Sequence, residues 1–295
     1  MPKLAVLDIG TNSIHMVLAE VQPDYTYKIL DRFKDMTRLG DGVFTSRRLS
    51  DQAMMRGLEV IRNLVTLARN KGYERIEGVA TSAVREARNG GEFLDHVAQQ
   101  TGLTVRVITG AEEARLIFLG VQNSVALPEP PTLVIDIGGG SVEVIVGNRE
   151  TIYQARSLKL GAIRLKDLYL TKTPPSKAML HELEEAVTGQ LKQALGTYKT
   201  KRVEQIIATS GMAGNLAEVI YLQRTGRPLQ QLNLTKISAK EIAAVEKRLA
   251  DATLKTRLAM PGLDPKRVDT LLPATMVFRI LLDLLQKNEL TICDK

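Results

Sequence analysis

The chain has 295 residues, of which 44 % are hydrophobic and 25 % are charged, values ordinary for a soluble globular protein with buried cores. The formal net charge of +7 favours anionic partners, but Lys and Arg form no block, and aromatic residues make up only 4 %, which argues against specific nucleic-acid binding. Because no apolar run approaches the roughly 18 residues of a membrane helix and the N-terminus lacks a signal-peptide pattern, we expect a cytoplasmic protein without membrane contact.

The metal-binding residue types are few. The single cysteine, Cys293, excludes a disulfide framework, and a total of only three histidines argues against a zinc site. Any metal ion should therefore be held by oxygen. The length fits two domains of ordinary size, and an internal repeat favours that division.

The first copy of the repeat occupies residues 4–21 and predicts a tight β-hairpin. An apolar run ends in Asp8, the turn carries Thr11, Asn12 and Ser13, and a second apolar run follows. Glycine and small hydroxylic residues in such a turn bring backbone N–H groups close to a ligand. An ordinary hairpin has no use for Asp8, whereas a carboxylate beside N–H donors suits a hard cation that bridges phosphate oxygens.

The rest of the first half predicts alternating helices and strands. A third strand is expected over 25–33, a basic glycine-bearing loop over 34–48, helices over 51–70 and 89–100, and strands over 76–80 and 104–108. Arg85 follows the strand 76–80 by a few residues, where α/β sheets place ligands. A solvated loop arginine is the alternative interpretation of this residue.

Glu113 lies in the first turn of a helix predicted over 109–121. Thr109 and Glu112 have the spacing of a capping box, so Glu112 has a structural role that Glu113 does not share. Acidic residues favour helix N-termini in any case, which leaves a structural explanation open. The position of the helix, just before the Pro-rich linker 126–131, favours a functional one.

The second copy of the repeat follows the linker, at residues 133–146. Its first strand ends in Asp136, its turn carries Gly138, Gly139, Gly140 and Ser141, and Glu143 stands two residues past the serine. One Asp-Gly turn would be unremarkable. Two copies in the same register, with Asp8 and Asp136 128 residues apart, predict two facing phosphate loops.

Helices and strands alternate again after this hairpin. We expect strands over 153–158, 203–209 and 290–293, a loop over 253–266, and helices opening at 159–164 and spanning 176–198, 239–250 and 266–286. The small-residue turn 210–215, with Ser210 and Gly211, is a third candidate phosphate cradle. The order predicts an α/β fold of two lobes, 1–125 and 126–295, each a mixed sheet with helices on both faces, and a cleft between the lobes.

Six segments form an ordered set across nearly the whole chain. They are DIGTNSIHM at 8–16, ATSAVREA at 80–87, TGAEEARLIFLGV at 109–121, DIGGGSVE at 136–143, LGAIRL at 160–165 and ATSGMAGNL at 208–216. This set resembles the exopolyphosphatase and guanosine pentaphosphate phosphohydrolase family. The resemblance implies two ribonuclease H-like lobes of the actin-like ATPase fold group, shared with sugar kinases and Hsp70, with an interlobe cleft.

The resemblance also implies a function and a site. The enzyme would release terminal orthophosphate from inorganic polyphosphate, or the 5′-phosphate of guanosine pentaphosphate, with Mg²⁺ as cofactor. Glu113 would be the general base that activates water, while Asp136 and Glu143 hold the metal and Asp8 joins them. The residues implied in phosphate binding are Asn12, Ser13, Arg85, Gly138, Gly139, Gly140, Ser141, Ser210 and Gly211.

Two departures from the family pattern concern the C-terminus. Some members carry a further helical domain, and members continue past the last strand, whereas this chain stops at Lys295, so we expect a truncated second lobe. Two other functions stay open: an ATP-dependent kinase or ATPase of the same fold group, and a non-catalytic sensor of alarmone or polyphosphate. Polyphosphate and guanosine penta- or tetraphosphate are the expected partners, and a homodimer is one option for the assembly.

Overall fold

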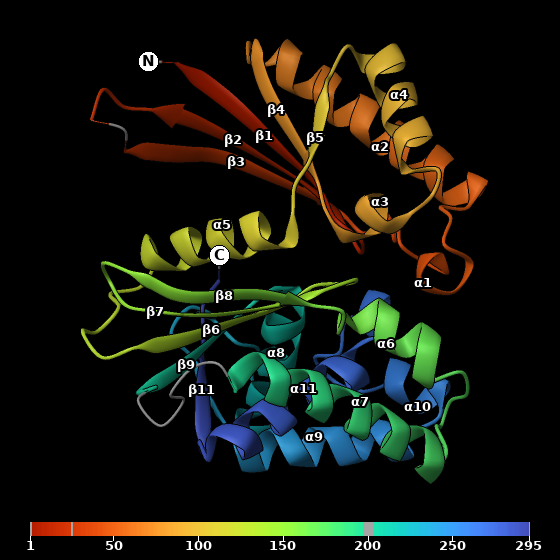
Figure 1. Cartoon of the computed structure of the whole chain (residues 1–295), viewed down its shortest axis with the longest axis vertical. Coiled ribbons are helices and arrows are strands. Elements are labelled where there is room, and N and C mark those ends of the chain that lie inside the picture. The colour runs from red at the N-terminus through yellow and green to blue at the C-terminus, as the bar shows by residue number, and fades with distance from the viewer. Residues whose placement is uncertain (1, 25, 197–202, 295) are drawn as a thin grey trace. The chain divides into compact units, whose positions relative to one another are not determined.

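The computed structural model describes residues 2–24, 26–196 and 203–294 (Figure 1). The chain divides into two compact units, Met1–Thr109 and Gly110–Lys295. The first unit contains a five-stranded sheet and the second a six-stranded sheet, each accompanied by helices. Both units are therefore α/β, as the sequence repeat predicts.

The first sheet has the strand order β3-β2-β1-β4-β5. Its strands are β1 (Lys3–Ile9), β2 (Ile14–Val21), β3 (Tyr27–Asp35), β4 (Arg75–Ala80) and β5 (Val105–Val107). The first three strands form an antiparallel meander, and β4 joins β1 in parallel. Buried residues alternate along β1 at Ala5, Leu7 and Ile9, so one face of the sheet carries the core and Asp8 lies on the other.

The described residues of the first unit form the helices α1 (Val43–Ser46), α2 (Asp51–Asn70), α3 (Ser82–Glu86) and α4 (Gly90–Thr101). The predicted start of α2 is confirmed, because the Ser50 side chain accepts from the Ala53 amide and caps the helix. Two short helices differ from the prediction. α1 lies inside the stretch 34–48 predicted as a loop, and α3 contains Arg85, for which a solvated loop position was the alternative interpretation. With 4 and 5 residues, both are too short to show helical periodicity.

The second sheet repeats the meander of the first. Its strands are β6 (Thr132–Ile137), β7 (Val142–Gly147), β8 (Ile152–Leu158), β9 (Gln205–Thr209), β10 (Lys236–Ser238) and β11 (Glu289–Ile292), in the order β10-β11-β9-β6-β7-β8. As in the first sheet, three consecutive strands pair antiparallel and the next strand, β9, joins the first in parallel. The repeat found in the sequence is therefore a repeat of topology.

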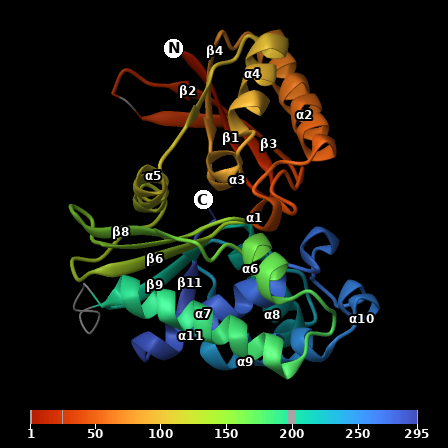
Figure 2. The same ribbon diagram turned by 45° about the vertical axis from the view of Figure 1, so that its right-hand side comes forward.

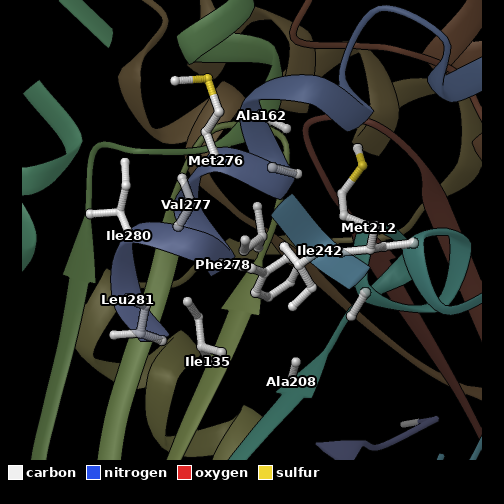
Figure 3. Packing of buried hydrophobic residues seen from close by; sticks show 14 of the residues in the cluster. Ile135, Ala162, Ala208, Met212, Ile242, Met276, Val277, Phe278, Ile280 and Leu281 are labelled. Atoms are coloured by element: carbon white, nitrogen blue, oxygen red, sulfur yellow. The ribbon is translucent and has the colours of Figure 1, made fainter. Parts of the chain in front are cut away.

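Helices cover both faces of the second sheet, as predicted (Figure 2). The described helices of the second unit are α5 (Gly110–Gln122), α6 (Ala162–Tyr169), α7 (Lys177–Leu195), α8 (Gly211–Thr225), α9 (Ala239–Asp251), α10 (Leu254–Leu258) and α11 (Leu271–Leu285). On one face the larger core joins α11 to the strands, and Figure 3 shows Phe278 of this helix toward Ile135 and Ala208. On the other face the sheet carries α5.

Helix α5 belongs to the second unit, whereas the sequence-based boundary at 125/126 places it in the first lobe. Its residues Ala114 and Phe118 are fully buried in one cluster with Val134 of β6 and Ile145 of β7. The close fit is visible at Gly147 of β7, where a Cβ would lie 2.6 Å from the Phe118 ring. The helix that bears Glu113 is thus packed on the second sheet.

Several predicted bounds change in the second unit. The helix predicted over 266–286 is divided into a 3-10 turn at Pro265–Arg267 and α11, and α10 occupies part of the loop predicted over 253–266. The predicted end of the helix 176–198 lies outside the described residues, and α7 ends at Leu195. In the described part of the chain, no helix has both the length and the apolar character that crossing a membrane requires.

Candidate active site

A row of four polar residues crosses the second sheet at the carboxyl end of β6. Asp136 lies opposite Glu143 of β7, and Glu143 lies opposite Ser157 of β8. On the other side of β6, Asp136 pairs in register with Thr209 of β9. Residues opposite one another in a sheet project from the same face. We call Thr209, Asp136, Glu143 and Ser157 the polar row.

Three core residues show which face the polar row takes. Val134, Ile145 and Ile207 each lie two positions from a member of the row on the same strand, and therefore on the same face. All three belong to the cluster that includes Ala114 and Phe118 of α5. The polar row consequently lies on the face of the sheet that α5 covers.

The carboxylates of Glu113 and Asp136 both lie close enough to Glu143 on this face to act on its charge. Glu143 is 1 % exposed. Burial raises the pKa of Glu143 well above its usual value, and the negative charges of Glu113 and Asp136 raise this pKa further, while hydrogen bonds from Ser157 and Ser141 act in the opposite direction. Glu113 lies in the first turn of α5, as predicted. One predicted catalytic residue and two predicted metal ligands thus meet within the second unit.

The turn between β6 and β7 is closed by a hydrogen bond of 3.0 Å from the Gly138 amide to the Ser141 carbonyl. The N-terminus of α6 packs on this turn. The amides of Ala162 and Ile163 donate to the carbonyls of Gly138 and Gly139, both at 2.9 Å. The turn is therefore fixed by a helix start that the sequence does not place beside it.

The same contact orients the amides of the turn. Arg164 Nε donates to the Gly140 carbonyl at 2.7 Å, so three successive carbonyls of the turn accept from α6. In a planar trans peptide the C=O and the following N–H point in opposite directions. The amides of Gly139, Gly140 and Ser141 therefore point away from α6, and successive N–H groups of this kind form a concave anion site.

The turn between β1 and β2 in the first unit is built in the same way. The Gly10 amide donates to the Ser13 carbonyl at 3.0 Å. The carbonyls of Thr11 and Asn12 accept backbone hydrogen bonds of 2.8 and 2.9 Å from the loop 38–40. Because the C=O and the following N–H of a trans peptide point in opposite directions, the amides of Asn12 and Ser13 point away from that loop. Both hairpin turns thus present backbone donors.

Asp8 stands opposite His15 in the first hairpin, so His15 takes the position that Glu143 has in the second. The Ser13 hydroxyl lies 2.7 Å from His15 Nε2. The Oδ1 atom of Asn12 is buried without a hydrogen-bond partner among the described residues. Such an oxygen can accept a hydrogen bond from a ligand, or coordinate a cation that the ligand brings.

Arg85 belongs to the same part of the first unit. The amide of Ala83, in α3, donates to the Thr11 hydroxyl at 3.1 Å, which holds the helix against the first turn. Arg85 lies two residues further along α3, and its Nη1 donates to the Ile108 carbonyl at 2.8 Å. The structure therefore brings the segment of Arg85 together with Asn12 and Ser13.

Ser210 has a structural role in addition to the predicted one. Its φ is 102°, a conformation that non-glycine residues rarely adopt. Its Oγ accepts from the amides of Met212 and Ala213 at 3.2 and 3.3 Å and caps α8. Gly211 is the first residue of α8. The amides of Met212 and Ala213 are therefore engaged in the cap, and the hydroxyl proton of Ser210 and the Gly211 amide are the donors that could meet a phosphate.

The donor set is compatible with a magnesium ion. The described residues include no group of three or more His, Cys, Asp or Glu side chains that could hold a metal ion. Mg²⁺ is commonly bound through one or two carboxylates, with water and substrate phosphates completing the octahedron. Asp136 and Glu143 supply two carboxylates in adjacent positions, and a cation would relieve the repulsion that disfavours ionised Glu143.

Four residues of this arrangement were not predicted as site residues. Ser157 and Thr209 belong to the polar row, and Gly161 and Arg164 hold the second turn from α6. Arg164 and Gly161 lie in the LGAIRL segment and Thr209 in ATSGMAGNL, so the ordered motifs carried a signal for three of them. Ser157 lies outside every motif, and only strand register reveals it.

A model of the Ppx/GppA phosphatase family matches residues 13–295. The chain belongs to the Ppx/GppA phosphatase family. This membership confirms the family predicted from the six segments and, with it, the enzyme class of a phosphoanhydride hydrolase. Exopolyphosphatases of this family generally use divalent metal ions, in agreement with the predicted class of cofactor.

Individual family members cover almost the whole chain. Exopolyphosphatase 2 of Mycobacterium tuberculosis is 29 % identical over 281 residues, which are 92 % of this chain and 87 % of that protein. The crystal structure of an exopolyphosphatase from Cytophaga hutchinsonii has a TM-score of 0.89 at 29 % identity, covering 99 % of this chain and 94 % of that one. A Ppx/GppA family member from Aquifex aeolicus has a TM-score of 0.80 at 25 % identity, with the same coverage. These matches confirm the predicted two-lobed fold class.

Proposed function

We propose that this Ppx/GppA family member is an exopolyphosphatase, which releases terminal orthophosphate from inorganic polyphosphate by attack of water. The observation that carries the proposal is the convergence of Glu113, Asp136 and Glu143 on one face of the second sheet, next to the turn 138–141. The exopolyphosphatases among its relatives support the same substrate class.

The proposed mechanism relies on positioning and on charge. A phosphoryl group in transfer passes through a loose transition state, so an enzyme acts mainly by holding the group and neutralising its oxygens. We assign this role to the amides of Gly139, Gly140 and Ser141, which point away from α6. Glu113 orients the attacking water and accepts its proton.

The remaining predicted ligands complete the proposed phosphate site. In the second unit they are Gly138 and the backbone amides of Ser210 and Gly211. In the first unit they are Asn12, Ser13 and Arg85, whose segments are held together by the contacts of Thr11. Arginine is suited to this role because its planar guanidinium matches two phosphate oxygens at once.

We propose Mg²⁺ as the metal ion, with Asp136 and Glu143 as its protein ligands and Asp8 as a further one. When bound, it supplies positive charge to the phosphate oxygens. Ser157 keeps the Glu143 carboxylate in one orientation through its hydrogen bond. The cleft between the lobes and the cytoplasmic location stay predictions, as does a homodimer.

One assay separates the candidate functions. Phosphate release is measured in parallel from long polyphosphate, tripolyphosphate, guanosine pentaphosphate and ATP, with Mg²⁺ and with EDTA. We expect release from polyphosphate that EDTA abolishes. Release from ATP alone would favour the kinase or ATPase alternative, and tight polyphosphate binding without release would favour the sensor. Release from guanosine pentaphosphate alone would assign the nucleotide as the substrate.

A further inference from the structure

Two segments of the first unit that are far apart in the chain are fastened together by three hydrogen bonds. The Arg88 amide donates to the Arg47 carbonyl at 2.9 Å. The Asn89 side chain accepts from the Leu49 amide at 2.8 Å and donates to the Leu49 carbonyl at 3.0 Å. Asn89 and Leu49 are both buried. We call residues 47–49 with 88–89 the arginine clip.

The clip presents three exposed arginines, Arg47, Arg48 and Arg88. Their guanidinium groups form no ion pair with any residue that the structure describes. Other exposed or half-buried arginines do pair, as Arg38 does with Asp41 at 2.9 Å and Arg75 with Glu77 at 3.1 Å. The backbone and Asn89 hold the clip, so its guanidinium groups are available to a ligand.

Of four carboxylates near the clip in the chain, Asp41 and Glu86 have other partners, and Asp51 and Glu92 each lie in the first turn of a helix. Asp41 pairs with Arg38. Asp51 lies in the first turn of α2, where the helix dipole favours a negative charge. Glu86 accepts a hydrogen bond of 3.1 Å from the Ser82 hydroxyl. The positive charge of the clip is therefore not cancelled by a partner on these segments.

Arg47 is also held in an unfavourable conformation. Its φ is 60°, in the left-handed region that favours glycine, where a side chain costs about 1 kcal/mol. Arg47 is the residue that ends α1, and glycine is the residue that most easily takes the left-handed conformation at the end of a helix. An exposed arginine that remains despite this cost points to a use for its side chain.

The clip adjoins the first phosphate turn. The loop 38–40, which binds the Thr11 and Asn12 carbonyls, leads through α1 to Arg47. Helix α3, which contacts the Thr11 hydroxyl, ends two residues before Arg88. Figures 1 and 2 both show α1 and α3 side by side. The two segments that support the turn therefore also carry the arginines.

We propose that the arginine clip is an accessory binding surface for a linear polyphosphate chain, beyond the phosphates bound by Asn12, Ser13 and Arg85. The inference rests on the proposed exopolyphosphatase function and adds a chain-length preference to it. Unpaired guanidinium groups on a backbone held in place by hydrogen bonds bind successive phosphates and release their counterions, so binding should weaken as salt rises. A substrate of three phosphates gains nothing from this surface.

The test compares two matched triple variants. The first combines Arg47→Ala, Arg48→Ala and Arg88→Ala, and the control combines Arg62→Ala, Arg149→Ala and Arg248→Ala, which remove the same charge from exposed positions elsewhere. For long polyphosphate the clip variant should raise KM about 10-fold and flatten the salt dependence of KM, with kcat changed less than about 2-fold. For tripolyphosphate both constants should stay near wild type. An equal loss on both substrates, or the same loss in the control variant, overturns the proposal.

Two further measurements separate binding from folding and from the proposed function. Arg47→Gly removes the side chain where glycine relieves strain, so the thermal midpoint should hold or rise while KM for long polyphosphate increases. A lower midpoint with unchanged KM would assign Arg47 a structural role and contradict the proposal. If the wild type releases no phosphate from either substrate, the proposed function fails, and a direct titration with long polyphosphate still decides whether the clip variant binds more weakly.

Discussion

The hydroxyl of Ser157 donates a hydrogen bond of 2.7 Å to Oε1 of Glu143, across the pairing of β8 with β7. Glu143 is almost fully buried and faces the negative charges of Glu113 and Asp136. A donor aimed at such a carboxylate favours its ionised form and fixes its orientation. Ser157 is therefore a positioning residue for the proposed metal ligand.

Ser157→Ala should weaken the response to Mg²⁺ more than it weakens the chemical step. Removing the partner that orients a metal ligand typically costs roughly 10- to 100-fold in metal affinity or activity. We expect the Mg²⁺ concentration for half-maximal phosphate release to rise by about that factor, and direct Mn²⁺ binding, followed by electron paramagnetic resonance, to weaken in parallel. Ser157→Thr, which keeps the hydroxyl, is the matched control. If Ser157→Ala needs the same Mg²⁺ concentration as the wild type, Ser157 does not position Glu143 for metal binding.

The raised pKa of Glu143 predicts how stability changes with pH in the absence of divalent metal. Above the ordinary value of 4.5, the folded protein keeps a proton on Glu143 that the unfolded chain has released. Stability therefore falls as pH rises from that value through the raised folded pKa, and it does not recover above it. Glu143→Gln cannot ionise and escapes this loss.

In EDTA, the thermal midpoint of Glu143→Gln should exceed that of the wild type at pH 8, and the difference should shrink as pH falls toward 4.5. Saturating Mg²⁺ should favour the wild type again, because an ion that binds only the folded protein stabilises it. If the thermal midpoints of the two proteins differ by the same amount across this pH range, Glu143 does not have a raised pKa.

Gly161 packs directly on the backbone of the second turn, and this contact leaves no space for a side chain. Its φ of −61° is open to any residue, but a Cβ would lie 2.3 Å from the carbonyl carbon of Gly140 and 2.4 Å from that of Gly139. These are backbone atoms, so the turn itself must move. Gly161→Ala should cost about 1–3 kcal/mol in the free energy of unfolding and displace the proposed phosphate-binding amides.

The matched control for this substitution is Gly189→Ala. Gly189 lies inside α7 with nothing within 4 Å of its Cβ position, and alanine there should add about 0.5–1 kcal/mol of stability. Urea unfolding and the kcat/KM for polyphosphate are measured for both variants. Wild-type stability and activity in Gly161→Ala would mean that the turn does not depend on this contact.

Local pattern predicted much of the fold. The two hairpins, their aspartates and the helix that begins after Ser50 follow from short-range periodicity and capping, which act within a few residues. Short-range patterns do not show on which of the two sheets α5 packs. Its place near the linker suggested the first lobe, whereas the packing of Phe118 against Gly147 and Val134 attaches it to the second.

Strand register explains why part of the site escaped prediction. The pairing of β7 with β8 shifts at Val146/Gly147, so the residue opposite Glu143 is not found by counting back from the turn. Ser157 could therefore be placed beside Glu143 only by the structure. The contact of α6 with the second turn is equally non-local, because Gly161 and Gly140 lie on separate elements whose approach depends on the whole core.

Glu113→Gln tests the proposed general base directly. The substitution keeps the size of the side chain and removes its ability to accept a proton, so turnover on polyphosphate should fall about 10²- to 10⁴-fold with little change in KM. Glu112→Gln, in the same first turn of α5, is the matched control and should remain near wild-type turnover. A second readout does not depend on activity: because the charge of Glu113 raises the pKa of Glu143, its removal should reduce the total loss of metal-free stability as pH rises. Unchanged turnover in Glu113→Gln, or an equal loss in Glu112→Gln, would exclude Glu113 as the base.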